Sequence, residues 1–333
     1  MSALDAKIRF LSDPGSFPDR PSRIEARETH MSWVFLADDW VLKLKKPVTT
    51  SFLDFSTIDA RHFFCCEEIR LNRRLAEETY SGVKPLYANF SGNLTFEKVG
   101  RAVDWLVEMR RLPEAHMLDQ RIQARDLAPA ELIGTAEKLV RFYAGCRPES
   151  VDGHMRHLMD ELDITRMILL RPEFDLEAEG VAALLEGIGR GLQVMRSKIE
   201  ERIKNGCLVE GHGDLRPEHI CLVRPPQIID CLEFNRSMRL VDPYDEIGYL
   251  ALECEVLGSG WIGQLFLTAL ERTLGNRPCD RLMGVFGGMR ALLRARLCLA
   301  HLLETPVRER EKWRPLALTY LKVARARLSL VVS

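Results

Sequence analysis

Residues 211–230 read G-H-G-D-L-R-P-E-H-I-C-L-V-R-P-P-Q-I-I-D, a stretch with little helical periodicity that is punctuated by Gly and Pro. We expect two small strands in it, at 219–223 and 227–230, around the turn-forming R-P-P. Asp214 then lies on a loop, and Asp230 ends the second strand 16 positions further along the chain. A chain that turns back between two carboxylates can place them side by side, so this stretch is the first candidate site.

Helical periodicity dominates the second part of the chain outside that stretch. Apolar residues from about position 129 onward recur at the spacing of one helix face. The expected helices are 129–146, 151–169, 176–205, 245–257, 261–274, 280–304 and 314–331. The two aspartates therefore occupy one irregular insert in a helical region.

The first 110 residues mix strands with one long helix. Two β-rich runs at 32–36 and 40–45 are separated by three turn-like residues, which predicts a tight hairpin. A capping-box pattern at Ser56 then opens a helix that we expect to reach about residue 76. Further extended runs follow at 83–90, 93–99 and 103–109. The whole pattern predicts an α+β protein whose smaller, mixed part precedes a larger helical part.

The composition is that of a globular protein of about two domains. The chain has 333 residues, of which 46% are hydrophobic and 29% charged. Its formal charge is −1, with no basic excess, so we expect neither a nucleic-acid nor a membrane-surface partner. Charged residues interrupt every long apolar run, including the first 11 residues, so we expect no spanning helix and no signal peptide. Nine scattered cysteines without a C-x-x-C pair predict reduced thiols in a cytoplasmic protein.

The H-x-D at 212–214, followed by a second Asp at 230, resembles the catalytic loop of aminoglycoside phosphotransferases and of the wider protein-kinase-like fold. The C-L-E-F-N after that Asp is most similar to an uncharacterised phosphotransferase-like group that is sometimes fused to a P-loop kinase domain. The resemblance implies a bilobal, α+β fold. Its nucleotide-binding lobe, with an antiparallel sheet and one long helix, would span 1–109, and its catalytic and substrate lobe 110–333. It also implies ATP, Mg²⁺, a small-molecule acceptor and a separate P-loop ATPase as a further partner.

Phosphoryl transfer needs positioning and charge neutralisation more than covalent chemistry from the protein. The resemblance makes Asp214 the carboxylate that orients the attacking hydroxyl and Asp230 a ligand of Mg²⁺. Arg216 stands where protein kinases carry a phosphate-contacting lysine, which makes it a candidate to stabilise charge on the transferred group. Where the fold has a metal-binding Asn, five residues after Asp214, this chain has His219. Imidazole is a softer ligand than an amide oxygen, so Mn²⁺ is a second candidate ion.

The first part of the chain offers an independent check, because residues i and i+2 of a strand share a face. A lysine aimed at the phosphates should follow an apolar residue that covers the adenine. Val41 precedes Lys43 in this way, whereas Lys45 has Lys43 at that position, so we expect Lys43 to contact the phosphates. On the following helix, Glu68 lies about 40° from an apolar stripe at 100° per residue. We expect Glu68 to form an ion pair with Lys43, with Glu67 as the weaker candidate.

Two further segments resemble parts of the same fold. The strand that ends E-M-R-R at 108–111 resembles the hinge between the lobes, which implies that the adenine edge meets backbone groups of Glu108, Met109 and Arg110. The D-P-Y-D at 242–245 resembles a motif whose carboxylates brace the catalytic loop. The chain departs from the kinase pattern in having no G-x-G-x-x-G, and residues 28–32 occupy the place of that phosphate-covering loop.

Three functions remain open at this point. The first is an ATP-dependent phosphotransferase that moves the γ-phosphate to a hydroxyl of an unidentified small molecule. Residues 147–206, where this family builds its acceptor site, hold 12 acidic and 9 basic side chains, a net of −3 that only slightly favours a cationic acceptor. The second is a catalytically weakened, kinase-like nucleotide-binding regulatory protein, suggested by His219 and the missing Gly-rich loop. The third is a metal-dependent hydrolase that uses His212, Asp214, His219 and Asp230.

Overall fold

The computed structural model describes residues 2–50, 53–304, 307 and 309–332. The chain forms two compact units, each with its own apolar core. Unit 1 consists of Met1–Arg121 and Glu218–Met238, and unit 2 consists of Ile122–Pro217 and Arg239–Ser333. Unit 1 therefore contains the expected N-terminal lobe together with a segment that returns from the second half of the chain. The lobe boundary at residue 109 stays a prediction.

Unit 1 is built on a six-stranded antiparallel sheet with the strand order β1-β2-β3-β8-β6-β7. The strands are β1 (Ile24–Glu28), β2 (Ser32–Ala37), β3 (Trp40–Lys45), β6 (Tyr80–Ala88), β7 (Leu94–Thr95) and β8 (Arg101–Arg110), and a small separate pair is formed by β4 (Thr49–Thr50) and β5 (Leu53–Asp54). The hairpin predicted from the β-rich runs is confirmed as β2 and β3, which are joined through Asp38 in the left-handed backbone region. The strand β1 was not expected.

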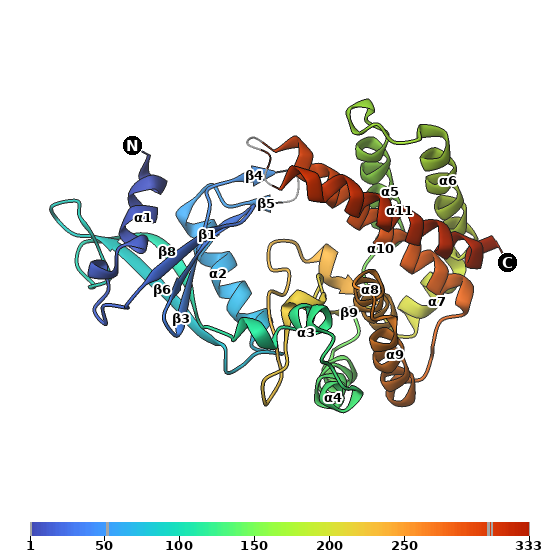
Figure 1. The fold of residues 1–333 in the computed structure, drawn as a ribbon, viewed down its shortest axis with the longest axis horizontal. Helices are drawn as coiled ribbons and strands as arrows, with labels where there is room; N and C mark the ends of the chain where they lie inside the picture. Colours follow the sequence, from blue (N-terminus) through green and yellow to red (C-terminus); the bar gives the residue numbers. More distant parts are fainter. Residues whose placement is uncertain (1, 51–52, 305–306, 308, 333) are drawn as a thin grey trace. The chain divides into compact units, whose positions relative to one another are not determined.

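Helices cover the sheet on both faces (Figure 1). The helix α2 (Ile58–Asn72) packs on one face, where Cys65 and Ile69 meet Val41, Val107 and Met109. The helix α1 (Ala3–Ser12), also not expected, packs on the other face against a core that contains Phe35, Leu42, Leu44 and Leu106. Because side chains alternate along β3, the face of Val41 is also the face of Lys43 and Lys45. Both lysines are thereby directed to the side on which α2 lies.

The predicted long helix begins and ends slightly differently from the expectation. The N-cap of α2 is Thr57, whose hydroxyl accepts from the N–H of Ala60 at 3.1 Å, so the capping box predicted at Ser56 is wrong by one residue. Its last helical residue is Asn72, four residues before the expected end. The side chain of Asn72 is used in the site described below, which gives this helix end a function in the structure.

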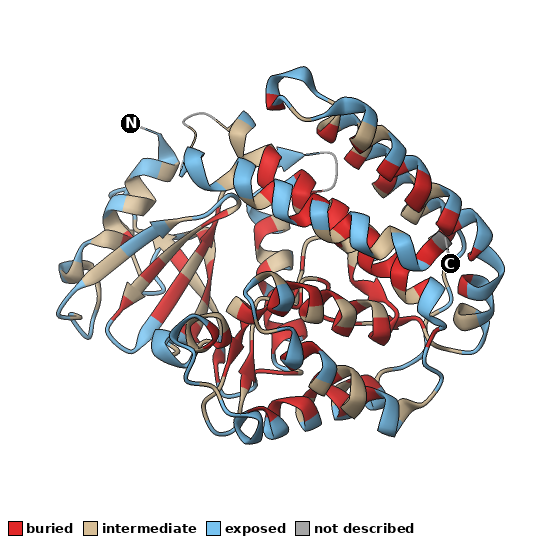
Figure 2. Ribbon diagram, turned by 45° about the vertical axis from the view of Figure 1, so that its right-hand side comes forward, coloured by how far each residue is buried: buried red, intermediate tan, exposed pale blue. Residues whose placement is uncertain are grey.

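Unit 2 is almost wholly helical, as expected. Its helices are α4 (Pro129–Gly145), α5 (His154–Leu169), α6 (Ala178–Val194), α7 (Arg196–Lys204), α8 (Pro243–Val256), α9 (Gly260–Leu274), α10 (Asp280–Ala300) and α11 (Arg310–Val332), while α3 (Leu118–Ala124) spans the change from unit 1 to unit 2. Figure 2 shows their buried stripes facing inward, and the most extensive contact is between α10 and α11. The expected helix 176–205 is two helices, because Met195 leaves the helical conformation (φ −87°, ψ 2°).

Four very short strands lie within and next to the irregular insert. The strands β10 (Ile220–Cys221) and β11 (Gln227–Ile228) pair in unit 1, close to their expected positions. The strands β9 (Val209–Glu210) and β12 (Leu240–Val241) pair in unit 2 on either side of the insert. None of the helices in the described part of the chain has the length and hydropathy needed to cross a bilayer.

Candidate active site

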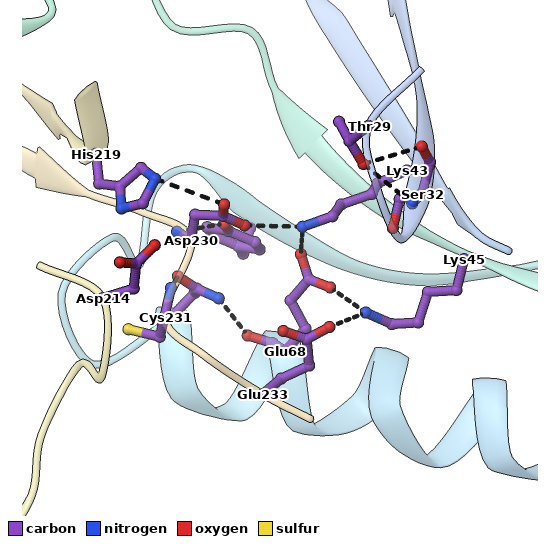
Figure 3. Close-up of polar contacts among 12 residues, drawn as sticks. Thr29, Ser32, Lys43, Lys45, Glu68, Asp214, His219, Asp230, Cys231 and Glu233 are labelled. Atoms are coloured by element: carbon purple, nitrogen blue, oxygen red, sulfur yellow. Dashed lines mark hydrogen bonds and ion pairs between the residues drawn. The ribbon is translucent and has the colours of Figure 1, made fainter. Parts of the chain in front are cut away.

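Lys43 in unit 1 joins two carboxylates from distant parts of the chain (Figure 3). Its Nζ lies 2.9 Å from Oε1 of Glu68 on α2 and 2.8 Å from Oδ1 of Asp230, which follows β11. The ion pair predicted between Lys43 and Glu68 is therefore confirmed, and the same lysine also holds Asp230. Asp230 is the most open of the three residues, with 46% of its side chain exposed.

Lys45, which the sequence analysis set aside, completes the same cluster. Its Nζ lies 2.6 Å from Oε2 of Glu68 and also contacts Oε1 of Glu233, and its side chain is fully buried. The ring of Phe55 lies 5.0 Å from this ammonium group. The two oxygens of Glu68 are thus bound by two different lysines, and Lys45 and Glu233 are the members that were not assigned to the site. The signal for Lys45 was the strand face that it shares with Lys43.

The surrounding charges keep Lys43 and Glu68 ionised despite burial. Burial alone would lower the pKa of Lys43, but the carboxylates of Asp230 and Glu68 outweigh it and raise that pKa well above its usual value. Burial alone would raise the pKa of Glu68, but Lys43 and Lys45 together lower it. For Glu233, burial exceeds the effect of Lys45, so the pKa of this carboxyl is raised. Glu68 is therefore the firmly charged partner of both lysines.

Two neutral hydrogen bonds fix the backbone that carries Asp230. The N–H of Asp230 donates to the Tyr80 hydroxyl at 3.2 Å, and the N–H of Cys231 donates to Oδ1 of Asn72 at 2.9 Å. Asn72 is fully buried and also donates to the Glu68 carbonyl at 2.8 Å, so one side chain links α2 to this segment. Asp230 has a φ of 63°, a conformation that a residue with a Cβ adopts at some cost. The backbone is held in this shape by contacts from two separate elements.

His219 lies beside Asp230 within unit 1. Its ring Nε2 is 3.7 Å from Oδ2 of Asp230, and 8% of its side chain is exposed. The ring nitrogen therefore points to the predicted metal ligand and not into the helical core, which is the orientation that a ligand role requires. The role itself stays a prediction.

The residues expected at the adenine edge lie at the end of β8. Met109 is paired with Val41 of β3 on one side and with Tyr80 of β6 on the other, and Val41 and Met109 are both buried. The N–H of Arg110 donates to the Thr79 carbonyl at 2.8 Å, so this donor is already used inside the sheet. Glu108 likewise lies between the two strands and binds Lys84 through its side chain. The assignment of these three backbones to the nucleotide stays a prediction.

Asp214 in unit 2 is held from both sides of its carboxylate. The Tyr249 hydroxyl donates to Oδ1 at 3.3 Å, and Arg216 donates to Oδ2 through Nε at 3.1 Å. The backbone N–H of Asp214 donates to Nδ1 of His212 at 3.3 Å, and His212 is fully buried. Burial raises the pKa of Tyr249 well above its usual value, so its hydroxyl remains a donor at neutral pH. Tyr249 is a contact of the candidate catalytic residue that the sequence analysis missed.

A second carboxylate, Glu246, braces the loop that carries Asp214. Its Oε2 accepts from the N–H of His212 at 2.9 Å, its Oε1 accepts from the N–H of Gly213, and Tyr143 donates to Oε2 at 2.7 Å. The D-P-Y-D motif predicted that its own two carboxylates brace this loop, and that prediction is wrong for both. Asp242 caps α8 and pairs with Arg202. The other motif carboxylate, at 245, pairs with Arg290.

The missed Glu246 had a weak signal in the sequence. It directly follows the D-P-Y-D motif and lies in the first turn of the helix expected at 245–257. Gly211 explains why this carboxylate can approach the loop so closely. A Cβ there would lie 2.4 Å from Oε2 of Glu246 and from Cγ2 of Val241. Gly213 has a φ of 90°, which again suits glycine.

The chemistry of the donors in unit 1 fits a hard divalent cation. Asp230 offers a partly exposed carboxylate, which is the ligand that Mg²⁺ prefers, and His219 adds a nitrogen donor suited to Mn²⁺. Within the described ranges, no three or more His, Cys, Asp or Glu side chains are gathered into a metal-binding group.

Comparisons with sequences identify relatives that are uncharacterised. No protein-family model matches the chain. An uncharacterised protein from Mycobacterium bovis and one from Mycobacterium tuberculosis are each 31% identical over 286 residues, which cover 82% of this chain and 54% of the relative. The chain thus spans about half the length of the curated relatives that it matches.

Comparisons with solved structures identify small-molecule kinases. A choline kinase from Cryptosporidium parvum gives a TM-score of 0.56 at 9% identity, over 99% of this chain and 96% of that one. A choline/ethanolamine kinase family protein from Mesorhizobium loti gives 0.52 at 15% identity, over 98% and 99%. A thermostable mutant of aminoglycoside phosphotransferase APH(4)-Ia, in a ternary complex with AMP-PNP and hygromycin B, gives 0.53 at 11% identity, over 99% of both chains. This likeness shows a shared fold, α+β with an antiparallel sheet before a mainly helical part.

Proposed function

Because the chain has the protein-kinase-like fold of aminoglycoside phosphotransferases and choline kinases, we propose that it is an ATP-dependent phosphotransferase. It transfers the γ-phosphate to a hydroxyl of a small molecule. The neighbours' names supply the first acceptors to test, which are choline, ethanolamine and hygromycin B. A separate P-loop ATPase partner remains a proposal from the sequence resemblance alone.

The contact set of Lys43 carries the proposal. One ammonium group placed between a helix carboxylate, Glu68, and a more exposed carboxylate, Asp230, is the arrangement that positions phosphates next to a metal ion. An isolated structural ion pair would need no third, half-exposed member. This observation supports nucleotide binding by unit 1.

In the proposed reaction, the acceptor oxygen forms a bond to the γ-phosphorus while the bond from that phosphorus to the β,γ-bridging oxygen breaks and ADP leaves. Asp214 accepts the proton of the acceptor hydroxyl, and Arg216 stabilises negative charge on the transferred group. Tyr249 keeps one carboxylate oxygen of Asp214 in place during this step. Lys43 holds the phosphates of the bound nucleotide.

Asp230 and His219 would hold the divalent ion. When bound, the ion would neutralise negative charge on the nucleotide phosphates. Lys43, which holds Asp230 in this structure, is then available to the phosphates.

A screen of hydroxyl metabolites for ADP release tests this function. The parent protein is incubated with ATP and Mg²⁺ or Mn²⁺ in the presence of each acceptor, and phosphorylated products are identified by mass. For an active acceptor, we expect Asp214→Asn to lower turnover by about 10² to 10⁴-fold, the usual effect of a positioned base, while the affinity for ATP stays nearly unchanged.

Asp280→Asn is the matched control, since it makes the same change at the exposed start of α10, outside the region 147–206, and should leave turnover unchanged. Equal turnover in Asp214→Asn and the parent would refute the assignment of Asp214. Tight ATP binding without turnover toward any acceptor would instead favour the nucleotide-binding regulatory protein.

A further inference from the structure

The segment 230–233 is tied to β3 by two ion pairs that run in register. Lys43 binds Asp230 at its start, and Lys45, two residues further along the strand, binds Glu233 at its end. Both lysines share Glu68, which contributes one carboxylate oxygen to each. Five charged side chains thus form one connected cluster that links β3, α2 and the segment after β11.

The second ion pair differs from the first in its exposure. The side chain of Lys45 is fully buried and 8% of the Glu233 side chain is exposed, whereas Asp230 is nearly half exposed. A ligand or an ion can therefore reach Asp230, while Lys45 offers no open surface. Lys45 can therefore influence a bound ligand only through the residues that it contacts.

Other contacts of this segment include neutral hydrogen bonds to its backbone and one from the Cys231 thiol to the Leu71 carbonyl. Tyr80 and Asn72 accept from the N–H groups of Asp230 and Cys231, but both act at the start of the segment. The ion pair with Glu233 fixes the end of the segment through a side chain. This second attachment is what can resist rotation of the peptides between Cys231 and Glu233.

We propose that Lys45 and Glu233 are positioning residues for the phosphate and metal site. The pair holds segment 230–233 so that Asp230 keeps its left-handed backbone and its carboxylate faces Lys43. Lys45 also acts as a permanent counter-ion of Glu68, which leaves Lys43 less tightly engaged and able to move to the phosphates. The effect on the nucleotide rests on the proposed phosphotransferase function, whereas the effect on the segment does not.

Replacement of the Lys45–Glu233 pair by apolar residues distinguishes a positioning role from a purely structural one. Exchange of a buried ion pair for apolar residues of similar volume is often neutral or stabilising, because the desolvation penalty is removed along with the attraction. The double variant Lys45→Met with Glu233→Met should therefore fold with a melting temperature near that of the parent. Under our proposal, the same variant loses its hold on segment 230–233 although its stability is kept.

The experiment measures three quantities on the full chain. Amide hydrogen exchange of the peptide spanning 228–236 is followed without nucleotide, AMP-PNP affinity with Mg²⁺ is measured by calorimetry, and the melting temperature is recorded. We expect faster exchange in that peptide. We also expect the affinity for AMP-PNP to fall about 10- to 100-fold, the usual effect of replacing a residue that orients a metal ligand. The melting temperature should stay near that of the parent protein.

The matched control is a buried ion pair elsewhere in unit 1. Arg61 binds Asp104 through two bonds of 2.8 and 3.1 Å, so Arg61→Met with Asp104→Met removes an equivalent pair from α2 and β8. This control should leave exchange at 228–236 and the AMP-PNP affinity unchanged. If the double Lys45 variant does not fold, Glu233→Gln retains an acceptor for Lys45 and should still show faster exchange.

Two results would overturn the proposal. One is parental exchange at 228–236 in the folded Lys45 and Glu233 variants. The other is a loss of affinity that the control variant reproduces. A parent protein that binds no AMP-PNP would refute the proposed function instead, and the exchange data alone would then decide whether the pair positions the segment.

Discussion

Tyr249 and Arg216 occupy different oxygens of Asp214, so the carboxylate is oriented by a neutral donor and by a cation at once. Loss of the neutral donor removes one hydrogen bond and leaves the charge of Asp214 paired. We expect Tyr249→Phe to lower kcat about tenfold, the usual effect of one hydrogen bond to a charged group, with little change in KM for ATP. Steady-state kinetics with the acceptor found by screening checks this.

Tyr244→Phe on the same helix is its control. The Tyr244 hydroxyl donates to the carbonyl of Gly275, away from Asp214, so the same deletion should leave kcat at the parental value. An equal loss in both variants would show that hydroxyl removal merely weakens α8.

Replacement of the single residue His219 tests which metal ion the site prefers. Its ring nitrogen lies beside Asp230, and imidazole favours Mn²⁺ and later metals over Mg²⁺ more than an amide oxygen does. We expect the parent to bind Mn²⁺·ATP more tightly than Mg²⁺·ATP, and His219→Asn to shift the preference toward Mg²⁺. Calorimetric titration with both ions measures it, and an unchanged ratio of affinities in the variant would exclude a ligand role.

At the scale of elements, α8 and the loop before β10 are joined through Glu246. Its replacement by Ala leaves two buried backbone N–H groups and the Tyr143 hydroxyl without this acceptor. We expect Glu246→Ala to lower the free energy of unfolding by about 2 to 5 kcal/mol, since each buried group left unsatisfied costs about 1–3 kcal/mol. Urea unfolding measures the change. Glu255→Ala, on the more exposed side of the same helix, should change stability by less than about 1 kcal/mol.

Local patterns predicted the elements well and their tertiary contacts less well. Alternation along β3 placed Val41 and Lys43 on one face, and helical spacing selected Glu68, so the pair between them followed from two local rules. The Lys45 contact with Glu233 joins residues that are far apart in sequence, and no periodicity encodes such a pairing. Glu246 was missed because α8 is buried on most sides, which removes the polar face that marks a useful carboxylate.

The predicted helix boundaries were wrong where the sequence contains no clear start or stop signal. The helix expected at 176–205 breaks at Met195, which has neither Gly nor Pro on either side to signal the change. The N-cap at Thr57 was displaced by one residue because Ser56 and Thr57 are both good caps, and only the hydrogen bond to Ala60 distinguishes them.

At the scale of the whole molecule, unit 1 is made of two pieces of chain that are separated by almost a hundred residues. The later piece supplies Asp230 and Glu233 to the lysines and Gln227 to Thr79, whose hydroxyl donates to it at 3.0 Å. We expect residues 1–121, produced alone, to lack a cooperative thermal transition, because Lys45 is then buried beside a single carboxylate. Circular dichroism on heating measures this.

Residues 1–121 joined to 218–238 by a flexible linker form the matched control. This chain contains the whole of unit 1, so it should regain a cooperative transition. A cooperative transition of the same midpoint in the shorter fragment would show that the later piece adds nothing to the stability of the unit.

The charge cluster around Glu68 also determines how Lys43 and Lys45 respond to amine-reactive reagents. Acylation requires the unprotonated amine, and the pKa values of both lysines are raised, so neither is a nucleophile at neutral pH. Lys43 retains 15% side-chain exposure, while Lys45 has none. A covalent probe for this protein would therefore need to displace Asp230 from Lys43 before it could react, and a survey of reactive lysines on the resting protein would pass over both.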